Sequence, residues 1–450
     1  MNEIVLIGSL VTFFLVFILI CTNKGIYNPI LYLMPYLVFI YLCAIYRTIY
    51  GFEDVRITSF ILGTTIESRL EVYINYTLAF NYFLLLGFLL QNTPPRKIVK
   101  IDSINLDSNI TALFNFFCLS LALLNFLYVT NVVSGGVLQY FLHLKLNAQK
   151  ISEIGLSTIA YNFVYASLIV TIIAYSSGNI SRTHLLFVLI IFFLIVLSKA
   201  RVTQLATDFL LVVIFYLRVS NKTISIKRFL SIFSLLFLVA ILTFTFRYIS
   251  DMYRVGMIEK LSIDETKFIF DLVVAKLLNE GNLPNYASFY AIYHSYGPII
   301  DYRCGETIIA PIFNLFSPLK VLVPESIDFT PTSIEFKQEL FPMDPGDGFP
   351  PSLFGDFYAN GGMLALITFI TMLLLFLWLL RYFLLRTSNP IVVFLIVYVI
   401  TKIIFILPKG EMARFNNVNV LILILPMVCF FLYLFSSRRA NDLSYMSRRR

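Results

Sequence analysis

Charged residues are scarce in this sequence. Only 13% of its 450 residues are Asp, Glu, Lys or Arg and 59% are hydrophobic, whereas soluble domains carry roughly 25% charged and about 45–50% apolar residues. There are three histidines, without HExxH or HxH spacing, so a transition-metal centre is not expected. The five cysteines show no CxxC spacing, which argues against a disulfide framework or a zinc site. These shortages exclude a soluble globular enzyme, a disordered chain and a typical nucleic-acid-binding protein.

Long apolar runs take the place of charged segments. A transmembrane helix needs about 20 mostly apolar residues, and we count eleven candidate runs, which predict an all-α, polytopic integral membrane protein. The sixth and seventh runs are short and are separated by Ser-Lys-Ala-Arg. We interpret this tetrapeptide as a tight turn between two helices; one long helix carrying buried charge is the alternative. The runs lie at residues 4–21, 28–46, 72–91, 109–131, 156–176, 185–198, 202–217, 229–246, 360–380, 391–408 and 418–436.

The basic residues predict the orientation of these helices. The formal net charge is +8, and in a membrane protein such an excess usually reports basic cytoplasmic loops, so no nucleic-acid partner is expected. With a cytoplasmic C-terminus, the inside loops hold 16 Lys and Arg residues, the short outside loops hold nine, and 23 of the 26 acidic residues lie elsewhere than inside. We therefore expect eleven spans with the N-terminus outside. A twelfth span near residues 52–70 would change only the N-terminal end.

One long segment between the eighth and ninth runs is too polar to span and lies outside in this topology. Residues 257–280 space their apolar side chains as an amphipathic helix does. Eight of the 17 prolines lie between Pro311 and Pro351, so the second half of the segment is expected to be largely extended or turning. The predicted parts are an N-terminal membrane bundle of about eight helices (1–246), a large external loop (247–359), and about three C-terminal helices with a basic cytoplasmic tail (360–450).

Two groups of basic residues at the predicted outer face are candidates for binding an anion. Lys199 and Arg201 lie in the polar turn, and Asp208 follows Arg201 by seven residues, hence on one helical face. A cation and a carboxylate placed this way are either an interfacial pair or part of an anion site at the mouth of a cavity. After the eighth run, Arg247 is the more obvious membrane anchor. Arg254 lies further from the membrane and is the better candidate for binding a ligand.

The loop re-enters the membrane through Pro-Pro-Ser-Leu-Phe-Gly-Asp-Phe-Tyr at 350–358. Ser352 is placed as a helix N-cap, and Gly355 would let the backbone approach a bulky ligand. Asp356 has two competing roles, as the complement of a helix N-terminus or as a general base.

The last outer turn holds Lys409, Glu411 and Arg414 within six residues. It is either a solvated turn or, with Lys402 below it, a cation cluster around an anion. His294 in the long loop is a further catalytic candidate, although a histidine in such a position more often has a structural role. Because ATP is absent outside the membrane, an enzyme acting there needs an activated, lipid-linked substrate. Arginines at this face suit a lipid diphosphate, since a guanidinium binds phosphate oxygens in a bidentate fashion.

Four motifs follow one another along the chain: Ser-Lys-Ala-Arg at 198–201, Tyr-Arg-Cys-Gly-Glu-Thr at 302–307 followed by Pro311 and Pro324, the run at 350–358 followed by Gly361 and Gly362, and Lys-Gly-Glu at 409–411. These motifs, in this order, resemble the O-antigen polymerase family of bacterial oligosaccharide repeat-unit polymerases. The family pattern has an Arg-Gly pair where this chain has Lys-Gly, which shifts the bidentate phosphate role in the last turn to Arg414.

The resemblance implies a C-type glycosyltransferase membrane fold in the bacterial plasma (inner) membrane, with a periplasmic loop. The implied reaction transfers a glycan from undecaprenyl diphosphate to the non-reducing sugar of another lipid-linked repeat unit. The sequence has no carboxylate pair with DxD spacing that would demand a divalent metal, so we expect an enzyme without a metal or other cofactor. The implied partners are undecaprenyl-diphosphate-linked oligosaccharides, membrane lipid, a chain-length regulator and a flippase. The implied catalytic candidates are Asp356, Glu411 and His294, and the implied diphosphate or substrate ligands are Lys199, Arg201, Arg254, Lys409, Arg414 and Tyr358.

Two other functions fit the same pattern of spans. An O-antigen ligase shares the architecture, and His294-Ser295 followed by Gly305 partly matches its loop, but Gly305 is better explained by the polymerase-like Gly-Glu-Thr. A non-enzymatic flippase or transporter of lipid-linked oligosaccharides needs a symmetric bundle and a polar lumen. This chain instead gathers its polar residues at one face and in one loop.

Overall fold

The computed structural model of the chain is all-α in the part that it describes. That part contains a single β-bridge, between Tyr296 and Ile300. The described residues are 65–91, 98–101, 108–142, 157–198, 202–221, 286–315, 332–340 and 351–409, together with the isolated positions 7, 8, 11, 12, 14, 15, 29, 41, 44, 45, 48, 49, 147, 231, 234, 245, 252, 267 and 330.

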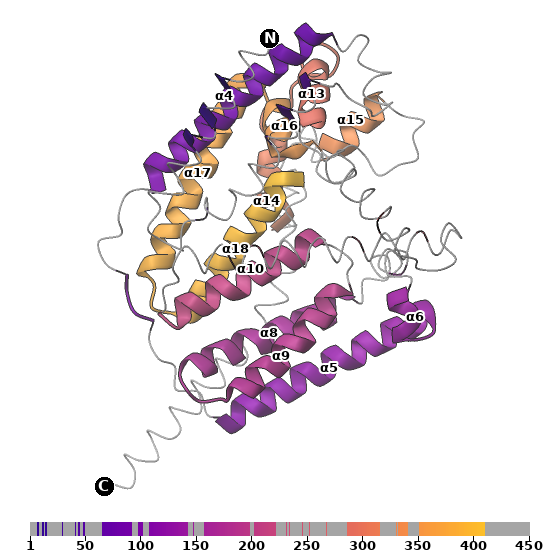
Figure 1. The fold of residues 1–450 in the computed structure, drawn as a ribbon, viewed down its shortest axis with the longest axis vertical. Helices are drawn as coiled ribbons and strands as arrows, with labels where there is room; N and C mark the ends of the chain where they lie inside the picture. The colour runs from indigo at the N-terminus through magenta and orange to yellow at the C-terminus, as the bar shows by residue number, and fades with distance from the viewer. Residues whose placement is uncertain are drawn as a thin grey trace. The chain divides into compact units, whose positions relative to one another are not determined.

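Twelve helices account for nearly all of the described ranges (Figure 1). They are α4 (Ile66–Gln91), α5 (Ser108–Ser134), α6 (Val137–Leu142), α8 (Ser157–Ser176), α9 (Arg182–Leu197), α10 (Val202–Val219), α13 (Tyr286–Ser295), α14 (Glu306–Leu315), α15 (Thr332–Leu340), α16 (Ser352–Ala359), α17 (Gly362–Arg386) and α18 (Pro390–Lys409).

Three of these helices are long and apolar enough to cross a membrane, over Glu67–Leu90, Ser108–Ser134 and Gly362–Arg386. This indicates a multi-pass membrane protein. Seven of the eleven apolar runs found in the sequence coincide with helices of the structure, namely α4, α5, α8, α9, α10, α17 and α18. Helix α9 ends at Leu197 and α10 begins at Val202, so separate helices lie before and after the Ser-Lys-Ala-Arg tetrapeptide, as expected. Residues 199–201 lie outside the described ranges. The runs at 4–21, 28–46, 229–246 and 418–436 lie outside the described ranges.

The second half of the long polar segment is more helical than its prolines suggested. The prediction of largely extended or turning chain is wrong for the described residues, where α14, α15 and α16 are helices. Pro331 stands directly before α15 and Pro351 directly before α16. Proline is tolerated at a helix start, because the first amide groups of a helix have no partner within it. The predicted amphipathic helix at 257–280 lies outside the described residues.

Close backbone contacts divide the chain into two compact units. Unit 1 comprises Met1–Asp102, Ala206–Ile241 and Lys260–Asn416, and unit 2 comprises Ser103–Leu205, Leu242–Glu259 and Asn417–Arg450. In unit 1 the two long helices α4 and α17 pack together, α13 packs on α4 and α16, and α16 and α17 both contact α18 (Figure 1).

A fully buried arginine closes the end of α17 within unit 1. Arg218, at the end of α10, donates hydrogen bonds to the carbonyl oxygens of Leu384 at 2.8 Å, Thr387 at 3.0 Å and Val99 at 2.8 Å. It also contacts the side chain of Asn221 at 3.3 Å. The last carbonyl groups of a helix have no partner within it and attract cations. Arg218 therefore serves as a C-terminal cap from another helix.

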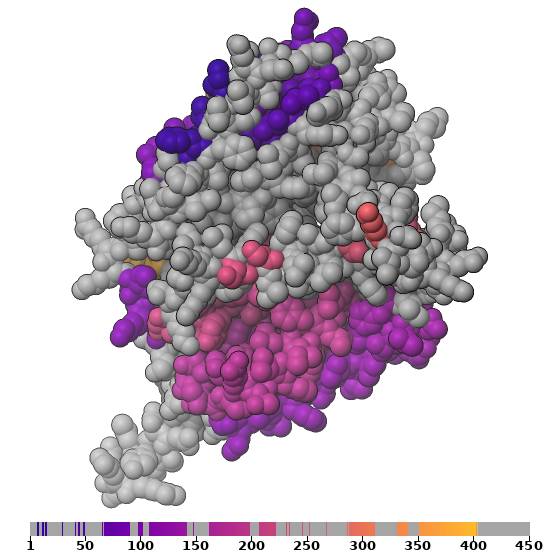
Figure 2. Space-filling model, viewed as in Figure 1, coloured from indigo at the N-terminus to yellow at the C-terminus, as the bar shows by residue number. Residues whose placement is uncertain are grey.

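In unit 2, helix α5 packs against α8 and α6, and α8 packs against α9. On the face seen in Figure 2, side chains of α5 (violet) and of α8 and α9 (magenta) lie side by side. Asn115 of α5 connects these helices from inside, donating to Thr171 at 2.8 Å, accepting from Ser167 at 2.9 Å and lying 2.9 Å from Nε2 of His184. Large apolar side chains such as Phe116, 71% exposed, cover the outside of α5. A lipid environment favours this arrangement, in which apolar side chains cover the outside of the helices and polar side chains lie between them.

Candidate functional site

Two of the motifs singled out in the sequence are joined directly in the structure. The backbone N–H of Arg303 donates to the carbonyl of Ala359 at 3.0 Å, and the N–H of Gly305 donates to Oδ1 of Asn360, also at 3.0 Å. The amide nitrogen of Asn360 donates to the hydroxyl of Thr307 at 2.7 Å. The turn before α14 and the end of α16 therefore form one hydrogen-bonded unit.

Two glycines of the second motif allow close packing around this unit. Gly362 has a φ of +68°, and a Cβ there would lie 3.2 Å from the hydroxyl of Tyr302. Gly355 faces helix α13, where a Cβ would lie only 2.8 Å from the side chain of Ile292. The space beside Gly355 is thus filled by α13 rather than left open for a bulky ligand.

The Ser352 N-cap expectation differs from the structure by one position. Helix α16 begins at Ser352 itself, with Pro351 as the N-cap residue, which makes no side-chain cap bond. The hydroxyl of Ser352 nevertheless accepts the N–H of Gly355 at 3.3 Å, the kind of bond by which an N-cap satisfies a free amide. The predicted interaction is present although the boundary is shifted.

A buried arginine in the turn before α14 connects α14 with α15. The side chain of Arg303 is 2% exposed and forms ion pairs with Glu335 of α15 at 3.3 Å and with Glu306 of α14 at 3.5 Å. The carboxylate of Glu335 also accepts the hydroxyl of Tyr296 at 2.7 Å. Burial, and secondarily Glu335, raises the pKa of Tyr296, which keeps this phenol a hydrogen-bond donor. The network assigns Glu335 a structural role.

Asp356 is enclosed beneath α15. Its side chain is completely buried, and Oδ1 accepts the hydroxyl hydrogen of Thr332 at 2.6 Å. Its backbone carbonyl accepts from the side chain of Asn360 at 2.6 Å. A general base must reach the hydroxyl that it deprotonates. The burial and the Thr332 contact therefore favour the structural role of Asp356 over the role of base.

Tyr358, predicted to contact substrate, belongs to a group of aromatic rings on α13, α16 and the turn between α13 and α14. Its ring centroid lies 5.0 Å from Tyr293, 5.7 Å from Phe289 and 6.3 Å from Tyr302. Tyr358 is 7% exposed whereas Tyr302 is 38% exposed. Burial and the neighbouring Tyr302 raise the pKa of Tyr358. Tyr302 and Tyr293 thus present the accessible part of this group, with Tyr358 behind them.

A carboxylate on α4 completes the accessible rim. The hydroxyl of Tyr293 donates to Glu71 at 2.9 Å and accepts from the side chain of Asn75 at 2.9 Å. Burial, followed by Glu71, raises the pKa of Tyr293 to about 12, so the phenol keeps its proton at neutral pH. Glu71 is exposed. Together, Glu71, Tyr293 and Tyr302 form a surface that we call the tyrosine–carboxylate rim.

His294 lies beside this rim, on the same helix as Tyr293. Its ring centroid is 4.6 Å from that of Tyr290 and 5.4 Å from that of Tyr293. Burial lowers the pKa of His294, while the charge of Glu71 acts in the opposite direction. Nε2 is buried and makes no hydrogen bond with the described residues.

The structure does not describe the side chains of the remaining predicted site residues. Lys409 is the last residue of α18. The catalytic candidate Glu411 and the predicted ligands Lys199, Arg201, Arg254 and Arg414 lie outside the described residues. Within the described ranges, no group of three or more His, Cys, Asp or Glu side chains is placed to hold a metal ion.

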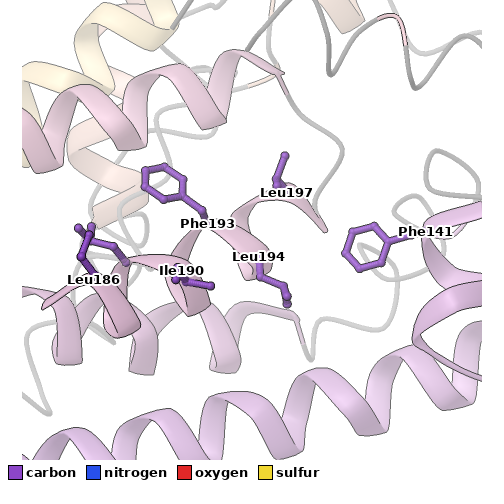
Figure 3. Close-up of a pocket in the computed structure, with 7 residues that line it drawn as sticks. Phe141, Leu186, Ile190, Phe193, Leu194 and Leu197 are labelled. Carbon is purple, nitrogen blue, oxygen red and sulfur yellow. The ribbon is translucent and has the colours of Figure 1, made fainter. Parts of the chain in front are cut away.

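Unit 2 contains a groove that, unlike the tyrosine–carboxylate rim, is lined by apolar side chains. It has a volume of about 650 Å³ and lies along α9, and Figure 3 shows Phe141 of α6 across from Leu194 and Leu197 of α9. Its other lining residues are Leu186, Leu189, Ile190 and Phe193. Hydrocarbon side chains offer no proton donor or acceptor, so this groove is suited to hydrocarbon contact and not to group transfer.

Sequence reasoning missed Glu71 and Tyr293. One signal was present, because Glu71 stands directly before the apolar run at 72–91, and a carboxylate at membrane depth is unusual and marks a functional candidate. The pairing itself joins residues far apart in the sequence and needed the structure. Comparison of the chain with protein-family profiles, with curated proteins and with solved structures finds no match.

Proposed function

We propose that the protein is a glycosyltransferase of the plasma membrane that joins undecaprenyl-diphosphate-linked oligosaccharide repeat units into a surface polysaccharide such as O-antigen. The proposal includes about eleven spans, a cytoplasmic C-terminus and a C-type membrane fold whose long loop faces the outside. It also includes metal-independent chemistry and cooperation with a chain-length regulator and a flippase.

The observation that carries the proposal is the direct joining of the 302–307 and 350–362 motifs beside the tyrosine–carboxylate rim. Carbohydrates bind to surfaces that combine flat aromatic rings with a few oriented polar groups, because such rings have an apolar face and a polar edge. The rim offers two tyrosines and an exposed carboxylate, held by α4 and α13. This composition suits sugar rings and their hydroxyl groups.

The proposed reaction needs a base and a stabilised leaving group. The acceptor hydroxyl attacks the anomeric carbon of the donor, its proton passes to a base, and the bond from that carbon to undecaprenyl diphosphate breaks. Glu71 is the proposed base, since its carboxylate is exposed and is oriented by Tyr293. The proposed ligands for the diphosphate remain Lys199, Arg201, Arg254, Lys409 and Arg414, because cations stabilise developing phosphate charge.

The experiment that tests the proposal is deletion of the gene followed by complementation. Deletion should leave single repeat units on the cell surface, the wild-type gene should restore the polymer, and Glu71→Gln should reduce chain formation by about 10²–10⁴-fold. Glu67→Gln is the matched control, as Glu67 is an exposed carboxylate one turn earlier on α4. Unattached lipid-linked polymer in the deletion would instead indicate a ligase, and repeat units trapped inside would indicate a flippase.

A further inference from the structure

Arg69, in the first turns of α4, is a buried cation whose charge the described residues leave unbalanced. Its side chain is 9% exposed, and the ion pairs of the described residues involve Arg303 instead. Nε of Arg69 is buried and makes no hydrogen bond with any described residue. A buried charge without a partner is strongly unfavourable, so such groups normally bind a counter-ion.

The carboxylates on the same helix are not placed to supply that partner. Glu67 and Glu71 stand two residues before and after Arg69. Residues two apart on a helix point to opposite sides, whereas pairs three or four apart face each other. Glu71 is, in addition, already the acceptor of the Tyr293 hydroxyl.

Neutral hydroxyl groups lie along the backbone at Arg69. Tyr286 donates its hydroxyl hydrogen to the backbone carbonyl of Arg69 at 2.8 Å, and the hydroxyl of Tyr290 lies 2.8 Å from that of Ser68. Burial raises the pKa of Tyr290, while the hydrogen bond with Ser68 and, after it, the charge of Arg69 oppose this shift. Tyr290 stays protonated at neutral pH and cannot neutralise the arginine.

A second unsatisfied nitrogen lies against Tyr290. The ring of His294 stacks edge-on against it with centroids 4.6 Å apart, and its Nε2 is buried without a described partner. Two buried nitrogen atoms, Nε of Arg69 on α4 and Nε2 of His294 on α13, therefore have no hydrogen-bonding partner among the described residues. An oxygen-rich anion would supply acceptors to both helices, because guanidinium and imidazole N–H groups bind phosphate and carboxylate oxygens.

We propose that the start of α4 is an oxyanion-binding site, in which Arg69 holds a phosphate or carboxylate group of the ligand and His294 adds a second contact. The nature of that group rests on the proposed function. In a lipid-linked oligosaccharide, the oxyanion is either the diphosphate or the carboxylate of an acidic sugar, and both would be presented at the outer face where α4 begins in the predicted topology.

The site can be tested on the purified full-length protein in phosphatidylcholine nanodiscs, which keep anionic lipid headgroups away. Binding of inorganic pyrophosphate and of glucuronate is measured by calorimetry for the wild type, for Arg69→Gln and for Arg182→Gln. Arg182 is an exposed arginine at the start of α9 and controls for the loss of one positive charge. Thermal unfolding without ligand shows whether each variant is folded.

At least one probe should bind the wild type and Arg182→Gln equally, and bind Arg69→Gln about tenfold or more weakly, as expected for a lost charge-assisted contact. Stronger binding of pyrophosphate identifies the diphosphate as the ligand, and stronger binding of glucuronate identifies an acidic sugar. Equal binding to wild type and Arg69→Gln, or no binding to either, overturns the proposal. Because neither probe requires polymerisation, this outcome is separate from the fate of the proposed activity.

Discussion

The side chain of Asn360 accepts the backbone N–H of Gly305 at 3.0 Å across 55 residues of sequence. The same amide group donates to the hydroxyl of Thr307 and to the carbonyl of Asp356. One side chain thus satisfies groups on α14, on α16 and in the turn between α13 and α14. Asn360 thereby holds together the two segments that carry Tyr302 and Tyr358.

Replacing this side chain should loosen the whole unit. Asn360→Ala removes all three hydrogen bonds and leaves buried polar groups unpaired, so the free energy of unfolding should fall by about 1–3 kcal/mol. Thr368→Ala is the control, because among the described residues that exposed hydroxyl bonds only to a carbonyl of its own helix. Chemical denaturation in detergent would measure both variants. Equal stability of the two would show that Asn360 does not hold the motifs together.

Asp356→Asn distinguishes the two roles considered for this residue. The amide oxygen of Asn can still accept the Thr332 hydroxyl, so a structural carboxyl group should be replaceable with a modest loss of stability. We expect the variant to keep forming polymer. A general base contributes about 10²–10⁴-fold in rate, so a variant that folds normally but yields only single repeat units would restore Asp356 as the base. The polymer ladder on a gel is the measurement.

Arg218 should be sensitive to conservative replacement. A lysine keeps the charge but cannot offer the planar set of donors that reaches the carbonyls of Leu384, Thr387 and Val99. Arg218→Lys and Arg218→Met should therefore both lower the free energy of unfolding, each by more than about 1 kcal/mol. The exposed Arg182→Lys should have no measurable effect. A fully stable Arg218→Lys variant would mean that charge alone caps α17.

His294 should make the stability of the fold depend on pH. Burial lowers its pKa in the folded state, so below the unfolded pKa of about 6.5 the unfolded chain binds the additional proton. Stability should therefore fall as the pH is lowered from about 7 to 5, and His294→Phe, which keeps an aromatic ring against Tyr290, should make this fall less steep. Thermal unfolding across this pH range measures the slope. An unchanged slope in the variant would assign the pH dependence to other groups.

The sequence predicted the long helices well because hydropathy alone determines them. The run at 109–131 became α5 at Ser108–Ser134, and the run at 391–408 became α18 at Pro390–Lys409. The helices of the polar segment were missed because proline was taken as a helix breaker. Pro331 and Pro351 instead stand directly before α15 and α16, a position where proline is tolerated.

The site was predictable only in parts. Both loop motifs were recognised, but their contact through Asn360 depends on tertiary structure. Glu71 and Tyr293 come from segments 222 residues apart, and no local pattern relates them. Asp356 shows the converse case. Its position at a helix start was evident, whereas its burial under Thr332 depends on how α15 covers α16.

The central claim is best tested by incubating the purified protein, in nanodiscs, with a synthetic undecaprenyl-diphosphate-linked repeat unit and no nucleotide sugar or ATP. We expect a ladder of lipid-linked products that differ by one repeat unit, with undecaprenyl diphosphate released at each step. Recovery of the unchanged repeat unit from folded protein, or its transfer only to a lipid A core acceptor, would contradict the assignment as a polymerase.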